Sequence, residues 1–176
     1  MRPSLRRLRR RAVPADDVLG RLPLGPGERV LSAAEDLDHT AWLVATNHAF
    51  AVLGPDGGLS RRHRWHEVDH GSWQRDNGLL TVTFVDRSRP GQWRLGQERH
   101  LLQTLRERVQ ASVVLTQELT LTGRRTGRAV IRQDLATREL LEQVVLGRGV
   151  RAGDPEVGAA VRAALDYLRE QVGMPS

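Results

Sequence analysis

The chain has 176 residues and a formal net charge of +6, and the 27 residues that carry its positive charge are all arginine. Because cysteine is absent, the sequence excludes disulfide bonds, thiolate metal sites and a cysteine nucleophile. No apolar run approaches the roughly 20 residues that span a bilayer, and the N-terminus has no apolar core of the secretory type, so we expect a cytoplasmic protein.

The positive charge is concentrated in an N-terminal tail. The first eleven residues hold six arginines and no acid, whereas residues 12–176 carry 21 arginines and 21 acids. Such a tail attracts nucleic-acid phosphate or anionic lipid, but a disordered leader or a start codon assigned too far upstream gives the same pattern. Residues 1–26 are interpreted as this tail and a Pro- and Gly-rich linker. The candidate anion-binding residues are Arg6, Arg7, Arg9, Arg10 and Arg11.

Short strands are expected after the linker. Runs rich in β-forming residues at 29–34, 41–46 and 49–53 are separated by turn signals. Asn77-Gly78 marks a tight turn between a further pair of strands, the second of which, residues 79–85, alternates with period two. With a last run at 92–95, the pattern predicts a six-strand antiparallel meander.

The period of the apolar residues changes to that of a helix over residues 97–113. Leu101, Leu102, Leu105, Val109 and Val113 recur at helical spacing, which predicts an amphipathic helix laid on the sheet. The strands and this helix form the first unit, residues 27–112.

Residues 113–176 are expected to form a second unit of strands and a terminal helix. Strand-like runs occupy 114–121, 128–132 and 140–146; the third run is also compatible with a helix, and we favour a strand. The terminal helix is predicted to begin after Asp154, a good N-cap, and to stop at Gly173. The predicted fold class is therefore α+β.

One stretch matches a catalytic signature, because His66, Glu67 and His70 fit the zinc metallopeptidase pattern HExxH. The pattern works only when both histidines lie one helical turn apart on the same face, with the glutamate beside them to activate water. Here Gly71 follows directly and the turn-forming residues 76–78 come soon after. We therefore predict that the histidines lie on the surface beside a half-buried strand and do not share a helical turn.

Two loops imitate anion sites. Residues 147–153 look like a phosphate-binding glycine loop before a helix, but Asp154 and Glu156 place negative charge at that helix start. The tip at residues 122–129 offers three arginines that could grip a phosphate. A connecting loop and a solvated turn are the preferred interpretations.

The strands followed by a helix, with the segments GERVL, AWLVATNHAFAVLG and RWHEVDHGSW, resemble the bacterial PH-like modules found in uncharacterised actinobacterial proteins. The resemblance covers roughly residues 27–112. It implies a bent antiparallel sheet or partial barrel closed at one end by a helix, and a role in binding without catalysis. PH domains that hold phosphoinositides present basic residues around the first hairpin, whereas residues 34–39 are acidic here. The resemblance therefore favours a protein partner or self-association over an inositol phosphate.

Three hypotheses follow. The preferred one is a non-enzymatic binding or scaffold protein built on a PH-like module, with no cofactor, metal or small-molecule substrate. The alternatives are a zinc metallopeptidase acting through residues 66–70 and a binder of nucleic acid or anionic membrane acting through the N-terminal tail. Whether residues 66–70 are helical separates the first two hypotheses.

Overall fold

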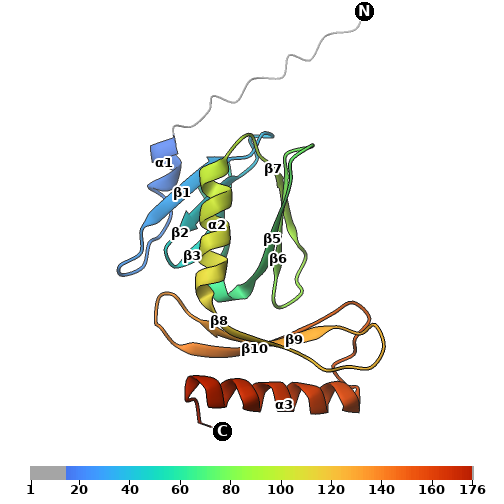
Figure 1. Cartoon of the computed structure of the whole chain (residues 1–176). Coiled ribbons are helices and arrows are strands. Elements are labelled where there is room, and N and C mark those ends of the chain that lie inside the picture. The colour runs from blue at the N-terminus through green and yellow to red at the C-terminus, as the bar shows by residue number, and fades with distance from the viewer. Residues whose placement is uncertain (1–14, 176) are drawn as a thin grey trace, which may run out of the picture.

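The computed structural model describes residues 15–175, which form two stacked units (Figure 1). A β-sandwich flanked by a long helix forms the first unit, and a three-stranded sheet covered by a terminal helix forms the second. The predicted fold class, α+β, is confirmed, and all strand pairs are antiparallel. Within the described range, no helix is both long and apolar enough to cross a membrane. The candidate anion-binding arginines, Arg6, Arg7, Arg9, Arg10 and Arg11, lie outside that range.

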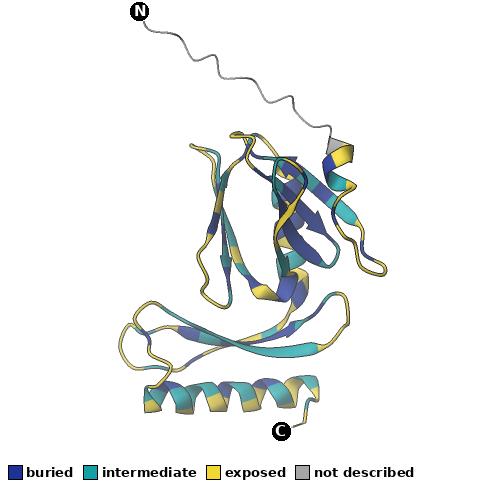
Figure 2. Cartoon of the chain, turned by 180° about the vertical axis from the view of Figure 1, so that it is seen from behind, coloured by how far each residue is buried: buried dark blue, intermediate teal, exposed yellow. Residues whose placement is uncertain are grey.

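The first sheet contains four strands paired in chain order. Its central strands consist almost entirely of apolar and small residues, and β3 is buried along its whole length, so both faces of the sheet are covered. Figure 2 shows this concentration of buried residues. The strands are β1 (Val30–Glu35), β2 (Trp42–Thr46), β3 (Ala49–Leu53) and β4 (Leu59–Arg64).

A second, three-stranded sheet packs against the first, in the order β5-β6-β7. The predicted turn between its first two strands is present, and Gly78 has a φ of 63°, which glycine adopts without steric cost. The two sheets enclose a core that includes Phe50, Trp65 and Leu80. The strands are β5 (Val68–Gln74), β6 (Leu79–Phe84) and β7 (Gly91–Arg94).

The prediction of one six-strand meander is wrong, because the chain forms seven strands in two sheets before the helix at Arg99–Ser112. The strand that sequence reasoning missed is β4, whose sequence LSRRHR is mostly polar. A short 3-10 turn, η1 (Trp65–Glu67), follows it and leads the chain into the second sheet. The strand β4 therefore depends on pairing with β3 and not on its own hydrophobicity.

Helix α2 (Arg99–Ser112) packs its apolar face on the sandwich, as the helical period predicts. Leu101 and Leu105 are buried in the sandwich core. The chain passes from Ser112 into the next strand without a loop, so Val113 begins a strand where the sequence pattern placed it on the helical stripe.

The predicted linker contains a short helix, α1 (Ala15–Leu19), that covers the outer face of the first sheet. Val18 and Leu22 are buried there against residues of β2 and β3. Glu28, which follows this segment, is bound to the first sheet. Its carboxylate accepts hydrogen bonds from the Thr46 hydroxyl at 2.6 Å and from the Arg62 guanidinium. The end of the predicted linker is thus part of the packed fold.

The second unit is a sheet in the order β10-β9-β8 with a helix on one face. The strand alternative for residues 140–146 is confirmed, and the helix begins and ends where the capping residues predicted. Its core is formed by Leu119, Ala129, Ile131, Ala164 and Leu168. The elements are β8 (Val113–Glu118), β9 (Gly127–Gln133), β10 (Leu140–Leu146) and α3 (Pro155–Val172).

The two units meet through polar side chains. Arg64 of β4 forms an ion pair with Asp134, which follows β9, and Arg128 of β9 binds Asp69 of β5 at 2.6 Å. Arg132 of β9 is 2% exposed and donates a hydrogen bond to the Ser112 hydroxyl at 2.8 Å. Burial lowers the pKa of Arg132 from its ordinary value. Each unit has an apolar cluster of its own, and Leu135 of the second unit also packs against the cluster of the first.

Candidate functional site

The HEVDH stretch crosses from a turn into a strand. His66 lies in η1 and His70 lies in β5, so the two histidines do not share a helical turn, as predicted. A register shift between Val68 and His70 breaks the regular alternation of the strand. His66 is 9% exposed, whereas His70 is exposed. The prediction of a surface histidine in a β segment is therefore confirmed for His70 and wrong for His66.

Glu67 closes the turn η1. Its Oε2 accepts a hydrogen bond from the backbone N–H of Arg64 at 2.8 Å. The neighbouring Trp65 is fully buried, and its indole N–H donates to the carbonyl of Thr46 at 2.9 Å. Glu67, which stands at the glutamate position of HExxH, and its neighbour Trp65 thus stabilise the connection between the two sheets.

His66 belongs to the interface between the units. Its Nδ1 lies 4.0 Å from Oδ2 of Asp134 and has no hydrogen-bond partner among the described residues, while its carbonyl accepts from the side chain of Gln143 at 2.8 Å. Burial alone would raise the pKa of Asp134. The amide of Ala136 and the guanidinium of Arg64 outweigh burial and lower this pKa below its ordinary value.

The remaining groups near the motif do not complete a metal site. The ring of His63 stacks on Phe84 with 4.0 Å between centroids, and its Nδ1 lies 3.8 Å from Oε2 of Glu67. In the part of the chain that the structure describes, no three His, Asp or Glu side chains converge as metal ligands would. His66, Glu67 and His70 are therefore not brought together as a ligand set.

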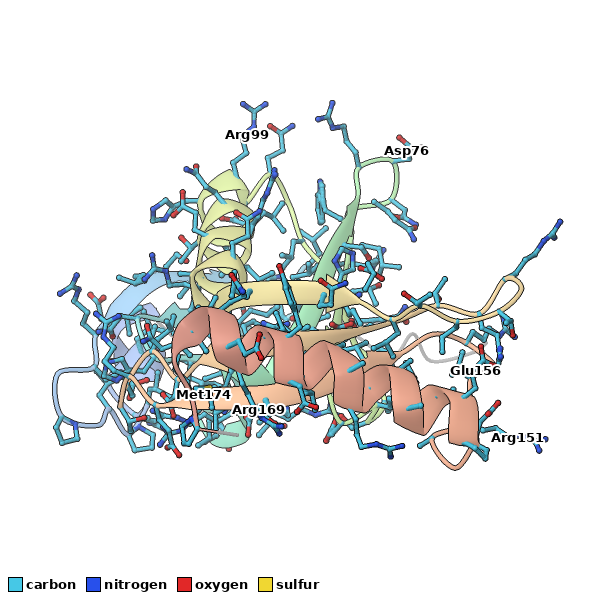
Figure 3. All side chains as sticks on the ribbon, turned by 60° about the horizontal axis from the view of Figure 1, so that its bottom comes forward. Asp76, Arg99, Arg151, Glu156, Arg169 and Met174 are labelled. Atoms are coloured by element: carbon cyan, nitrogen blue, oxygen red, sulfur yellow. The ribbon has the colours of Figure 1, made fainter. Side chains whose placement is uncertain are left out.

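Arg125, in the β8–β9 connection, binds acidic groups of the chain itself. Arg125 binds Asp154 at 2.6 Å and also binds Glu156. Asp154 is the N-cap of α3, and Glu156 lies in the first turn of that helix (Figure 3). Asp154 caps the helix by accepting the N–H of Glu156 at 2.9 Å. Arg128 is engaged by Asp69. Two of the three arginines of residues 122–129 are therefore engaged within the chain, whereas Arg124 is exposed.

A groove runs along the free edge of the second sheet. In that sheet β5 pairs with β6 alone, and α2 packs beside it. Between them lies a hollow of about 640 Å³ lined by residues 70–73 of β5, by Leu80 and by one face of α2, which we call the β5/α2 groove. A methyl group on Gly71 would overlap the side chain of Leu105, so this glycine allows the helix to pack close to the strand.

The β5/α2 groove has an apolar floor and basic polar groups. Trp73, Leu102 and Val109 line it and are only partly buried, so they leave apolar surface open to a ligand. Among the described residues that line the groove, the charged or titratable ones are His70 and Arg106, and none is an acid. Among the described residues, Arg106 has no ion-pair partner.

Sequence reasoning did not identify this groove. The sequence pattern places Leu102 and Val109 on the helical stripe that is predicted to pack on the sheet. Apolar periodicity shows which residues share a face, but not whether another element covers the whole of that face. The one signal was Gly71 within a strand, because an isolated strand glycine marks a close approach of another backbone or a ligand.

Membership of a known family would supply a further guide to the site. Comparison with protein-family models, with curated proteins and with solved structures finds no match to this chain. The geometry of the site is therefore the basis of the functional argument.

Proposed function

We propose that the protein is a non-enzymatic binding module that accepts an extended segment of a partner protein in the β5/α2 groove. The observation that carries this proposal is the edge of β5, which no strand of the described residues pairs with, beside an apolar hollow. An extended peptide adds to such an edge as a further strand. Main-chain hydrogen bonds then supply affinity, and alternate side chains enter pockets that supply specificity.

The arrangement of the first unit supports a PH-like scaffold for this function. Four strands, then three strands, then a helix form two packed sheets with α2 along one side. This order fits the bent sheet closed by a helix that the resemblance implies. A scaffold of this kind presents edges and grooves to ligands, and its function resides in those surfaces.

The charge of the groove favours an acidic partner segment. Arg106 lies on its wall, and no acid lies among the described lining residues, so an acidic side chain in the ligand would meet complementary charge. In an extended ligand, alternate residues face opposite sides. The expected ligand therefore alternates apolar residues, which contact Trp73, Leu102 and Val109, with acidic residues directed toward the rim.

Selection of random displayed peptides on the immobilised full chain tests this proposal. We expect enriched peptides to alternate apolar and acidic residues and to protect amides of β5 from hydrogen exchange when they bind. Arg106→Glu should weaken their binding roughly three- to tenfold, because a partly exposed charge pair contributes modestly. Leu102→Asp should weaken it more, because it places a charge on the apolar floor.

The matched control is Arg108→Glu, which makes the same charge change on the same helix at a residue that does not line the groove. Its peptide affinity should stay close to that of the unchanged protein. Peptides that bind equally to all variants, or that leave the β5 amides unprotected, would contradict the proposal. Concentration-dependent dimerisation abolished by Leu102→Asp would instead identify a second copy of the chain as the occupant.

A further inference from the structure

The sheet of the second unit has a free edge of its own. Strand β8 pairs with β9 alone, so its other side meets no strand of the described residues. Leu119, directly after β8, donates its N–H to the carbonyl of Gly127 at 2.8 Å. Because N–H and C=O groups alternate in direction along a strand, Thr116 and Glu118 direct theirs to the open side. We propose that this edge pairs with β8 of a second copy of the chain, at a surface separate from the β5/α2 groove.

The edge of β8 has few of the devices that keep edge strands apart. Natural edge strands carry charged side chains, proline or bulges that prevent pairing with another chain. Strand β4, an edge of the first sheet, has three arginines in the sequence LSRRHR. Strand β8 has the sequence VVLTQE, in which Glu118 is the one charged residue. Its register shift lies at the start, between Val113 and Leu115, and leaves residues 115–118 in regular pairing with β9.

Apolar surface is concentrated beside this edge. Of the six large apolar side chains that the described residues expose, Val113 and Val114 lie on β8 and Tyr167 lies on α3. Tyr167, Gln117 and Glu118 line a hollow of about 280 Å³ between the strand and the helix. Among the described residues that line this hollow, none is basic. The edge therefore suits a largely neutral strand, which β8 itself is.

The position of α3 fits a two-fold arrangement of two copies. Helix α3 lies over β8 and β9, roughly midway between strands that are about 4.8 Å apart. Across a two-fold axis beside β8, this position places the two α3 helices about 10 Å apart, a distance at which helices pack. The flanks that meet carry Ala160, Ala163 and Tyr167, so two small residues leave room for the aromatic ring. The second copy therefore extends the sheet and packs α3 against α3.

The sequence of β8 is compatible with pairing to itself. In an antiparallel pair centred on Gln117, each Gln117 lies opposite its counterpart, and each Glu118 lies opposite Thr116 of the second copy. Like charges therefore do not lie directly opposite each other, a contact that would be unfavourable. Leu115 and Leu119, which pack in the core beneath α3, become cross-strand neighbours. They continue that core from one copy into the other.

Sedimentation velocity of the full chain over a dilution series tests the proposal. We expect a dimer that dissociates to monomer on dilution. Val114→Arg should raise the dissociation constant of the dimer about tenfold or more, because it places a charge from each copy at the pairing edge. The matched control is Leu59→Arg, on an edge strand of the first sheet, where the replaced side chain is 43% exposed against 40% for Val114. It should leave the dissociation constant unchanged.

A cysteine at the centre of the pair reports its geometry. The chain has no cysteine, so Gln117→Cys supplies one thiol in each copy. Residues directly opposite in an antiparallel pair have Cα atoms about 4.5–5.5 Å apart, a separation that a disulfide spans. We expect Gln117→Cys to form a covalent dimer on mild oxidation much faster than Thr137→Cys, the control at an exposed position of the β9–β10 turn.

Three results would overturn the proposal. A monomer at every concentration, or equal effects of Val114→Arg and Leu59→Arg in variants that are folded by circular dichroism, would exclude pairing through β8. Crosslinking of Gln117→Cys no faster than that of Thr137→Cys would exclude the antiparallel pair. Dimerisation that Leu102→Asp abolishes and Val114→Arg leaves unchanged would place the contact in the β5/α2 groove instead.

Discussion

At the scale of single residues, Gly71 determines how α2 packs on β5. The backbone of Gly71 has no positive φ, so the need for glycine comes from space and not from conformation. Leu105, which occupies the space above it, is buried and has little freedom to move aside. One missing side chain thus sets the geometry of the β5/α2 groove.

We expect Gly71→Ala to lower the free energy of unfolding by about 1–3 kcal/mol, the usual cost of overpacking. Urea denaturation measures this change. Gly153→Ala is the matched control, because no atom lies within 4 Å of the added methyl group; it should be neutral or slightly stabilising. Equal stability of the two variants would show that α2 does not press on Gly71.

The sequence predicted the conformation of the HEVDH residues better than their surroundings. The turn signals near Gly71 excluded a helix, and residues 66–70 are indeed not one helical turn. The burial of His66 was not predictable, because its cover comes from Asp134 and Gln143, more than 60 residues away in the chain. Local patterns do not report contacts of that separation.

At the scale of elements, α3 is the helix that its own sequence specifies most fully. Asp154 caps its start, Pro155 occupies the first position, and Gly173 ends it with a φ of 69°. Arg125 adds a tertiary contact to the cap through its ion pair with Asp154. Near the other end, Arg169 binds Glu142 of β10 at 2.6 Å and lowers the pKa of that glutamate (Figure 3).

Replacement of Asp154 by alanine should lower the free energy of unfolding by about 0.5–2 kcal/mol, because the N–H of Glu156 loses its acceptor. Chemical denaturation followed by far-ultraviolet circular dichroism measures the loss. The control is Asp166→Ala on the same helix, an exposed residue whose ion pair with Arg169 spans one turn; its effect should not exceed about 0.5 kcal/mol. A larger loss for Asp166→Ala would contradict the assignment of the cap.

The elements that the sequence did not predict are those without a local signal. The polar strand β4 exists because five of its six residues pair across to β3. Helix α1 exists because Val18 fits against the outer face of the first sheet. Both are cases in which tertiary contact outweighs local preference. The β5/α2 groove has the same origin, since it is formed by an edge strand and by a helix more distant in the chain.

At the scale of the whole molecule, charged contacts join the two units. Asp134 is 5% exposed and binds Arg64 across the junction. Because its pKa is lowered in the folded protein, its contribution to stability is present above the pKa of the unfolded chain and is lost as the pH falls through the folded value. The junction should therefore weaken from about pH 4 downward.

Asp134→Asn tests this pH dependence. At neutral pH the variant should be less stable by about 1–3 kcal/mol, because a buried charged acceptor is lost, and the difference from the unchanged protein should shrink as the pH falls below about 4. Urea denaturation at a series of pH values measures both effects. Asp76→Asn, in the exposed β5–β6 turn, is the control and should not alter the pH profile. A constant difference at all pH values would contradict the role of the ionised carboxylate.

The passage from α2 into β8 joins the units in a second way. The helix ends at Ser112 and the strand begins at Val113, so no flexible residue lies between the wall of the β5/α2 groove and the sheet of the second unit. If a bound segment displaces α2, the strand must follow the helix or the helix must bend. The second unit is thus mechanically coupled to the groove. The backbone amides of β8 should therefore respond when a segment binds in the groove, even though β8 lies outside the groove.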